Sequence, residues 1–226
     1  MGLGSAFLSI LLLLLAIAAQ AYLLGSLDSG IMISKFVYHD DIRNHGSGNA
    51  GMTNILRTFG KGAAAATLTG DMLKGVLAVV FGEMLFGLMP QSLFTPIVGG
   101  FIAMIFATIG HLKPIFFAFR GGKGVSVVGG CLIALHPLYI ICLVIIFLVA
   151  VKITKMVSFA SICAAIGLPI VVILHSVFMA QRALPDLWFC TIVSIVMCGT
   201  VVYKHRDNIK RIREGTEYKF DGKSKK

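Results

Sequence analysis

The chain has 226 residues, of which 57% are hydrophobic and 13% are charged, and it carries a formal net charge of +10 at pH 7. With a mean hydropathy of +0.90, it is too apolar for an ordinary soluble protein, so the composition predicts an integral membrane protein. The five cysteines are odd in number and show no Cys-x-x-Cys spacing. They therefore predict neither a disulfide framework nor a metal site.

Seven apolar stretches follow one another along the chain. Backbone amides in lipid must be satisfied within their own segment, so each stretch predicts a transmembrane helix. The first resembles a signal peptide, but no Lys or Arg precedes Lys35, and we expect a retained span. The fourth and fifth are short, and His136-Pro137 separates them because proline interrupts a helix. The predicted spans are 5–27, 62–88, 93–111, 124–136, 138–151, 158–180 and 186–203.

The positive charges give these spans an orientation. With the N-terminus outside, 18 of the 20 Lys and Arg residues lie in cytoplasmic segments, whereas fusing the two short spans would break the positive-inside rule. We therefore expect an all-α integral membrane protein with seven transmembrane helices and a cytoplasmic C-terminus, in which residues 1–226 form a single domain. The net charge then reflects topology and attraction to anionic lipid, and we expect no nucleic-acid partner.

A polar run broken by glycines, NHGSGNAGMTN, interrupts the apolar chain at residues 44–54. Its glycines let the backbone approach a ligand, its other residues offer uncharged hydrogen-bonding groups, and an arginine three residues later supplies a fixed cation. This is the inventory of a phosphate site. A solvated loop rich in turn residues is the competing interpretation. The candidate ligand-binding residues are Ser47, Asn49, Thr53, Asn54 and Arg57.

A second polar run, RGGKG at residues 120–124, places two cations around three glycines at the predicted start of a helix. Backbone amides and the helix dipole suit an anion there. The run is not a nucleotide-binding P-loop, because Phe117 stands where that motif has its first glycine. Two topology-setting cations in a flexible turn would give the same pattern. The candidate residues are Arg120, Gly121, Gly122, Lys123 and Gly124, with His111 expected to cap or anchor the preceding helix.

Further candidates lie toward the C-terminus. Ser158 and Ser161 are three residues apart and share a helix face, although such serines often bond a backbone carbonyl one turn back. His205 and Asn208 have the same spacing, and Glu217 follows the turn at Gly215. Because the unperturbed pKa of histidine is about 6.5, His205 is the best-placed group for proton transfer near neutral pH. A solvated basic tail is the alternative.

One pair of opposite charges falls inside the second predicted span. Asp71 and Lys74 are separated by three residues in an otherwise apolar helix. Charges within a membrane are costly, so they indicate either a functional role or a structural ion pair that steadies the helix.

Five ordered motifs resemble the bacterial acyl-phosphate:glycerol-3-phosphate acyltransferases: GSGNAGMTNILRTFGKG, DMLKG, GHLKPIFFAFRGGKGV, SFASI and HRDNIKRIREGTE, within residues 24–217. The resemblance implies a seven-helix inner-membrane enzyme that transfers an acyl group from acyl phosphate to the 1-hydroxyl of sn-glycerol 3-phosphate, giving 1-acyl-glycerol 3-phosphate. It implies no cofactor and no metal. It also implies membrane lipid as surroundings and a functional coupling to the enzyme that makes acyl phosphate. One departure is Asp28, where the family commonly has proline.

The resemblance also assigns roles to the candidate residues. One phosphate would be held by Ser47, Asn49 and Arg57, and the other by Lys123 with the amides of its neighbouring glycines. Ser161, His205, Asn208 and Glu217 would complete the polar site. Phosphate is a good leaving group, so positioning, charge neutralisation and removal of one hydroxyl proton could suffice. The proton acceptor is either His205 or a phosphate oxygen of the donor.

Three other function classes would also place polar groups in a membrane or lipid-metabolising protein. A thioester-dependent soluble-type acyltransferase would carry His-x-x-x-x-Asp, which the sequence lacks. A lipid-alcohol phosphotransferase would show clustered aspartates for Mg²⁺, and the sequence has only the adjacent pair Asp40-Asp41. A transporter for a phosphorylated solute is the main alternative, although its site would need polar groups at mid-membrane and on both faces.

Overall fold

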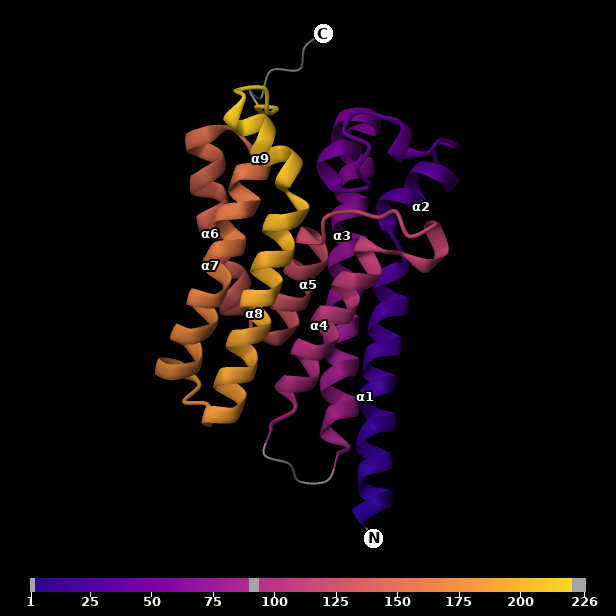
Figure 1. Cartoon of the computed structure of the whole chain (residues 1–226). Coiled ribbons are helices and arrows are strands. Elements are labelled where there is room, and N and C mark those ends of the chain that lie inside the picture. The colour runs from indigo at the N-terminus through magenta and orange to yellow at the C-terminus, as the bar shows by residue number, and fades with distance from the viewer. Residues whose placement is uncertain (1–2, 90–93, 221–226) are drawn as a thin grey trace. The chain divides into compact units, whose positions relative to one another are not determined.

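The computed structural model describes residues 3–89 and 94–220 (Figure 1). Every regular element in these residues is a helix. The chain forms two compact units, Met1–His136 and Pro137–Lys226. Residues 90–93, which belong to a predicted outer loop and include the first residue of the third predicted span, lie outside the described ranges.

The first unit contains α1 (Leu3–Ser26), α2 (Ser29–Phe36), η1 (Ile42–Asn44), α3 (Met52–Gly87), α4 (Ile97–Leu112), η2 (Ile115–Phe117) and α5 (Val125–Leu135). Helix α3 contacts each of the other α-helices of this unit, and α1 also packs along α4. Gly25 and Gly110 allow the close approach of α1 to α4, because a Cβ at either position would collide with the backbone of the other helix. The loop after α2 and the turn before α5 lie at the end of the unit opposite the N-terminus (Figure 1).

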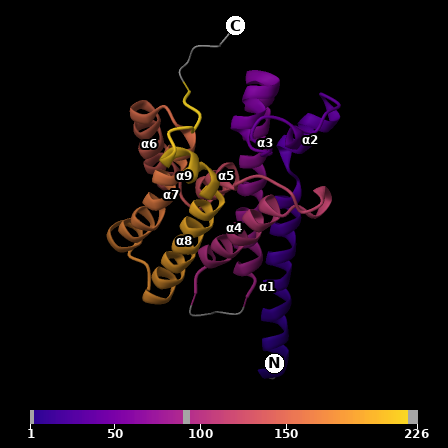
Figure 2. The same cartoon turned by 45° about the horizontal axis from the view of Figure 1, so that its top comes forward.

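The second unit contains α6 (Pro137–Thr154), α7 (Val157–Leu174), the π-helical turn η3 (His175–Met179), α8 (Leu184–Lys204) and α9 (Arg206–Arg213). Helix α7 packs against both α6 and α8. The short α9 contacts the ends of α7 and α8, as Figure 2 shows. The chain after α9 returns to the α6–α7 turn, where the N–H of Phe220 donates to the carbonyl of Lys155 at 2.6 Å.

Six helical stretches within the described residues are long and apolar enough to cross a membrane: Phe7–Phe36, Met52–Gly87, Ile97–Phe117, Pro137–Thr154, Val157–Met179 and Leu184–Lys204. The fourth predicted span corresponds to α5, which has 11 residues. At 1.5 Å per residue it rises about 16 Å, roughly half the thickness of a hydrocarbon core. The count of seven spans and the orientation of the termini therefore stay predictions.

The largest difference from the predicted elements concerns the start of α3. The helix begins at Met52 rather than at residue 62, so Thr53, Asn54 and Arg57 lie on a helix instead of in a loop. A kink at Gly60, with φ 87°, separates this first segment from the rest of α3. The segment is helical because Ile55 is fully buried in an apolar cluster with residues of α2, η1 and the loop, which anchors its inner face.

Two short α-helices, α2 and α9, were also not predicted. Asp28 accepts the N–H of Ile31 with its side chain at 3.1 Å and so caps the start of α2. Helix α9 occupies part of the predicted basic tail. The helical backbone is interrupted at His205, which ends α8 and precedes α9.

Candidate functional site

The glycine-rich loop between η1 and α3 is held in shape by one side chain. Asn54 is 3% exposed, and its amide nitrogen lies within hydrogen-bond distance of the carbonyls of Ile42, His45 and Asn49, at 2.9 to 3.3 Å. Its side-chain oxygen accepts the N–H of Ser47 at 3.0 Å. Because both ends of the amide bind the loop backbone, Asn54 shapes the loop, and we assign it no substrate contact.

The other candidate residues of this segment lie close to Asn54 in the sequence. Ser47 is exposed at the loop, and Asn49 is partly buried, with its side-chain oxygen accepting the N–H of Gly51 at 2.9 Å. Thr53 is partly buried in the first turn of α3, and Arg57 is exposed one turn later.

An arginine that the sequence reasoning missed ties this loop to the second polar run. Arg43 in η1 binds Asp41 through both ends of its guanidinium, at 2.9 and 2.6 Å. Its third nitrogen donates to the carbonyls of Phe117 at 2.8 Å and Arg120 at 3.3 Å. The hydrogen bond and charge of Arg43 hold the pKa of Asp41 well below its usual range. Both partners therefore stay charged, and this Arg43 clamp fixes the two segments side by side.

The turn RGGKG is built directly on the end of α4. The N–H of Gly122 donates to the carbonyl of His111 at 3.1 Å, and Gly124 caps α5 in a left-handed conformation, with φ 87°. A Cβ on Gly122 would collide with Nε2 of the His111 ring, so only glycine fits there. A Cβ on Gly121 would likewise collide with the carbonyl oxygen of His111. Arg120 is exposed and Lys123 is partly buried.

Beneath this turn lies a buried charged cluster of Asp28, Asp71, Lys74 and His111, whose members are 0 to 4% exposed. The Nζ of Lys74 lies 2.9 Å from Asp71, 2.8 Å from the carbonyl of Leu27 and 3.0 Å from Nδ1 of His111. Asp28 Oδ2 has no hydrogen-bond partner among the described residues and lies 3.7 Å from Nδ1 of His111. The predicted Asp71–Lys74 pair is confirmed, and His111 extends it to the turn.

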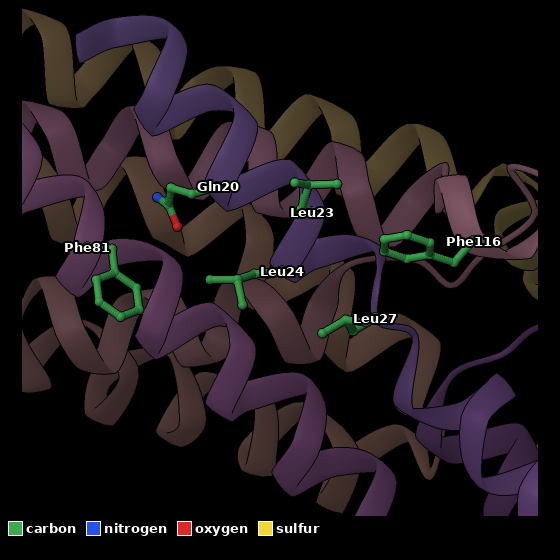
Figure 3. A pocket seen from close by; sticks show the side chains of 6 residues that line it. All are labelled: Gln20, Leu23, Leu24, Leu27, Phe81 and Phe116. Carbon is green, nitrogen blue, oxygen red and sulfur yellow. The ribbon is translucent and has the colours of Figure 1, made fainter.

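An apolar groove of about 400 Å³ runs along α1 in the same unit. Figure 3 shows it extending from Phe81 and Gln20 at one end to Phe116, in η2, at the other. The lining residues are Gln20, Leu23, Leu24, Leu27, Phe81 and Phe116. Phe116 lies only four residues before Arg120, so the groove ends at a segment that leads directly into the glycine turn.

In the second unit, Glu217 joins two helices, α7 and α9. Its side chain is 6% exposed and accepts hydrogen bonds from Ser158 in α7 and from Asn208 and Arg211 in α9, each at 2.7 Å. Burial alone would raise the pKa of Glu217, but these three donors lower it below its ordinary value. The carboxylate therefore stays ionised at neutral pH. Ser161 donates instead to the carbonyl of Val157 at 2.9 Å.

His205 is 3% exposed at the junction between α8 and α9. Its Nδ1 lies 2.7 Å from the carbonyl of Val201. A carbonyl oxygen only accepts hydrogen bonds, so Nδ1 carries a proton, and in the neutral ring Nε2 is the nitrogen without one. This geometry suits a proton acceptor.

Comparison with known proteins decides the family. A family model described as glycerol-3-phosphate acyltransferase matches residues 14–215. The chain belongs to the glycerol-3-phosphate acyltransferase family. It is 39% identical over 207 residues to the glycerol-3-phosphate acyltransferase of Clostridioides difficile (strain 630), covering 92% of this chain and 95% of the relative. The enzyme of the same description from Syntrophomonas wolfei is 38% identical over 209 residues, covering 92% and 98%.

Solved structures of this acyltransferase family agree with the fold. The glycerol 3-phosphate form of PlsY (YgiH), an integral membrane glycerol 3-phosphate acyltransferase, matches with a TM-score of 0.76 at 30% identity, over 92% of this chain and 95% of that one. The lysophosphatidic acid form of the same protein matches with a TM-score of 0.74 at 28% identity, over the same shares of the two chains. The chain is therefore an all-α integral membrane protein.

For this acyltransferase, the structure brings the predicted residues together in two sets. The first unit joins the loop around Ser47 to the glycine turn through Arg43. The second unit joins Ser158 and Asn208 through Glu217. Sequence reasoning missed Arg43 because its partners are mostly backbone carbonyls of a distant turn. The Asp-x-Arg spacing at residues 41–43, next to a glycine-rich loop, was the one available signal.

Proposed function

We propose that the protein transfers an acyl group from acyl phosphate to the 1-hydroxyl of sn-glycerol 3-phosphate, giving lysophosphatidic acid and phosphate for phospholipid synthesis. The two solved structures of PlsY (YgiH) are described as its glycerol 3-phosphate and lysophosphatidic acid forms, and these compounds are the acceptor and the product of the proposed reaction. The observation that supports this proposal most directly is the Arg43 clamp, which holds two glycine-rich, cation-bearing segments together. Each proposed substrate brings one phosphate, so a reaction that joins them needs two such anion sites.

In this proposal the glycine turn binds the donor phosphate, and the loop around Ser47 with Asn49 and Arg57 binds the phosphate of the acceptor. The acceptor oxygen attacks the acyl carbonyl, the bond between that carbon and the phosphate oxygen breaks, and Lys123 neutralises the charge that develops on the leaving phosphate. The hydroxyl proton goes to Nε2 of His205 or to an oxygen of the departing phosphate. No covalent enzyme intermediate is required.

Residues around Glu217 have a supporting part in the proposal. Ionised Glu217 holds Ser158 and Asn208 in fixed orientations, which suits groups that position a substrate hydroxyl. The apolar groove along α1 offers a surface for an acyl chain, whether of a substrate or of a neighbouring lipid. We also propose that acyl phosphate comes from a functionally coupled enzyme that makes it.

The donor is tested with purified protein in detergent, where transport is impossible and product formation alone counts. Initial rates are compared for acyl phosphate and acyl-CoA with the same acyl chain, and we expect turnover with acyl phosphate only. Lys123→Ala should lose about 3 kcal/mol or more of transition-state stabilisation, roughly 100-fold in kcat/KM. Lys123→Arg should recover part of the loss. The exposed Lys113→Ala is the matched control and should keep wild-type rates.

Comparable rates with acyl-CoA would refute the proposed donor. A fully active Lys123→Ala would remove this turn as the donor-phosphate site. Absence of any acyl transfer by folded protein would favour the transporter alternative.

We also propose that the protein lies in the bacterial cytoplasmic (inner) membrane and that its active site faces the cytoplasm. In a cysteine-free background, single cysteines at Ser47 and Lys210 should react with a membrane-impermeant thiol reagent only from the cytoplasmic side. A cysteine at Gln91 should react only from outside. Labelling of all three from one side would contradict the orientation.

A further inference from the structure

The buried Lys74 ammonium determines which nitrogen of His111 carries the proton. An ammonium has three hydrogens and no acceptor capacity. Three acceptors surround it at hydrogen-bond distance: a carboxylate oxygen of Asp71 at 2.9 Å, the carbonyl of Leu27 at 2.8 Å and Nδ1 of His111 at 3.0 Å. Nδ1 must therefore accept, so it carries no hydrogen. The imidazole is then the neutral tautomer whose proton is on Nε2.

The opposite edge of the ring faces the glycine turn. Nε2 of His111 lies where a side chain of residue 122 would be, which is the close approach that requires Gly122. His111 is 2% exposed, and its carbonyl also accepts the N–H of Gly122 at 3.1 Å. The ring is therefore fixed from below by Lys74 and from above by the turn. Its Nε2–H is a preorganised donor at the base of the anion site.

A second polar group lies on the same face of α4. Thr108 precedes His111 by three residues, is 1% exposed, and its methyl group lies 3.0 Å from where a Cβ of Gly124 would be. Its hydroxyl has no hydrogen-bond partner among the described residues. A buried hydroxyl without a partner costs free energy, and Thr108 is placed next to Gly124, where an anion bound at the turn would supply that partner.

We propose that His111 and Thr108 form the floor of the donor-phosphate site, with Nε2–H of His111 and the hydroxyl of Thr108 donating to a phosphate held at the turn of residues 120–124. The inference rests on the proposed function in one respect, that the anion is phosphate. It also assigns a role to the buried charged cluster. Lys74 and Asp71 keep His111 in the tautomer that presents a hydrogen to the anion, so they are positioning residues for a substrate contact.

The first test is spectroscopic and requires no turnover. Full-length protein labelled with ¹⁵N-histidine is studied in detergent micelles by long-range proton–nitrogen correlation, which distinguishes the two neutral tautomers. His111 is assigned by comparison with His111→Gln, or, if that variant does not fold, by single replacement of the other five histidines. Without ligand, His111 should be protonated at Nε2 and not at Nδ1. Inorganic phosphate should then shift the Nε2 resonance in a saturable way, and chloride at equal ionic strength should not.

The second test is kinetic and uses substitutions that separate the two ring nitrogens. The side-chain nitrogen of glutamine reaches about as far as Nε2, whereas that of asparagine reaches only as far as Nδ1. His111→Gln should therefore stay within a few fold of the wild-type KM for acyl phosphate, and His111→Asn should raise that KM about tenfold or more. Thr108→Val should raise it about fivefold. Thr67→Val removes another buried hydroxyl that has no partner in the part of the chain that the structure describes; it is the matched control and should change little.

The outcomes separate this inference from the proposed function. A proton on Nδ1 of His111, or a phosphate-insensitive His111 in protein that turns over acyl phosphate, would overturn the inference. Equal effects of His111→Gln and His111→Asn would also overturn it, since they would indicate a purely structural ring. A phosphate-sensitive His111 in protein that does not turn over acyl phosphate would support the anion contact and contradict the proposed donor.

Discussion

Replacing Lys74 by methionine tests whether the buried charged cluster stabilises the fold. The substitution keeps the length of the side chain but removes an ammonium that has three acceptors within 3.0 Å. It leaves Asp71, which is 1% exposed, as a buried charge without its nearest cation. Removing one partner of a buried ion pair costs about 3–5 kcal/mol. For a chain of this size, about 2–4 °C per kcal/mol converts this to a fall in Tm of roughly 6–20 °C.

The double variant Asp71→Asn/Lys74→Met provides the internal comparison. It removes both charges, so most of the lost stability should return, with a Tm within about 5 °C of the wild type. Thermal unfolding in detergent can be followed with a thiol-reactive fluorophore, because Cys131 and Cys190 are buried in the folded protein. Lys113→Met, at an exposed position, is the control. A single variant as stable as the wild type, or a double variant no better than the single, would refute the reasoning.

Three further predictions concern the candidate site. If His205 is the base, His205→Gln should lower kcat about 100-fold with little change in KM; a near-wild-type kcat would instead favour the donor phosphate as proton acceptor. The pKa of Glu217 is lowered in the folded protein, so its ionised form stabilises the fold at pH values above the usual glutamate pKa of about 4.3. This stabilisation is lost as the pH falls from the usual pKa to the lowered pKa of the folded protein. Tm should therefore fall more between about pH 5 and pH 3 in the wild type than in Glu217→Gln, and parallel curves would contradict this. Arg43→Lys should raise KM for both substrates about tenfold, because an ammonium cannot bind Asp41 at two points while also bonding the turn; unchanged KM values in steady-state assays would show that the clamp is dispensable.

The sequence predicted the apolar helices because their signal is local. Long apolar runs are unambiguous in lipid, and the buried pair of Asp71 and Lys74 was recognisable from its spacing alone. The start of α3 could not be predicted in the same way. Thr53 and Asn54 favour turns, and the helix forms there because Ile55 is buried against α2 and η1, a tertiary contact that the local composition does not reveal.

The site residues divide along the same line. Candidates named by their chemistry, such as Lys123 and His205, were found in the sequence because each lies in a polar run that borders an apolar stretch. The contacts between distant residues were harder to predict. Arg43 binds backbone carbonyls more than 70 residues away, and Glu217 meets Ser158 across 59 residues. No pattern of neighbouring residues predicts such long-range contacts, so only the fold could identify them.

The hydrogen bonds of Asn54 have a consequence for the thermodynamics of binding. A glycine-rich loop normally loses much conformational entropy when it closes around a ligand, and that loss weakens affinity. Here one buried amide already fixes the backbone at residues 42, 45, 47 and 49. The entropy is therefore lost when the chain folds, before any ligand arrives. An anion that enters the loop meets an ordered backbone, so its binding enthalpy is converted into affinity with little offset from loop ordering.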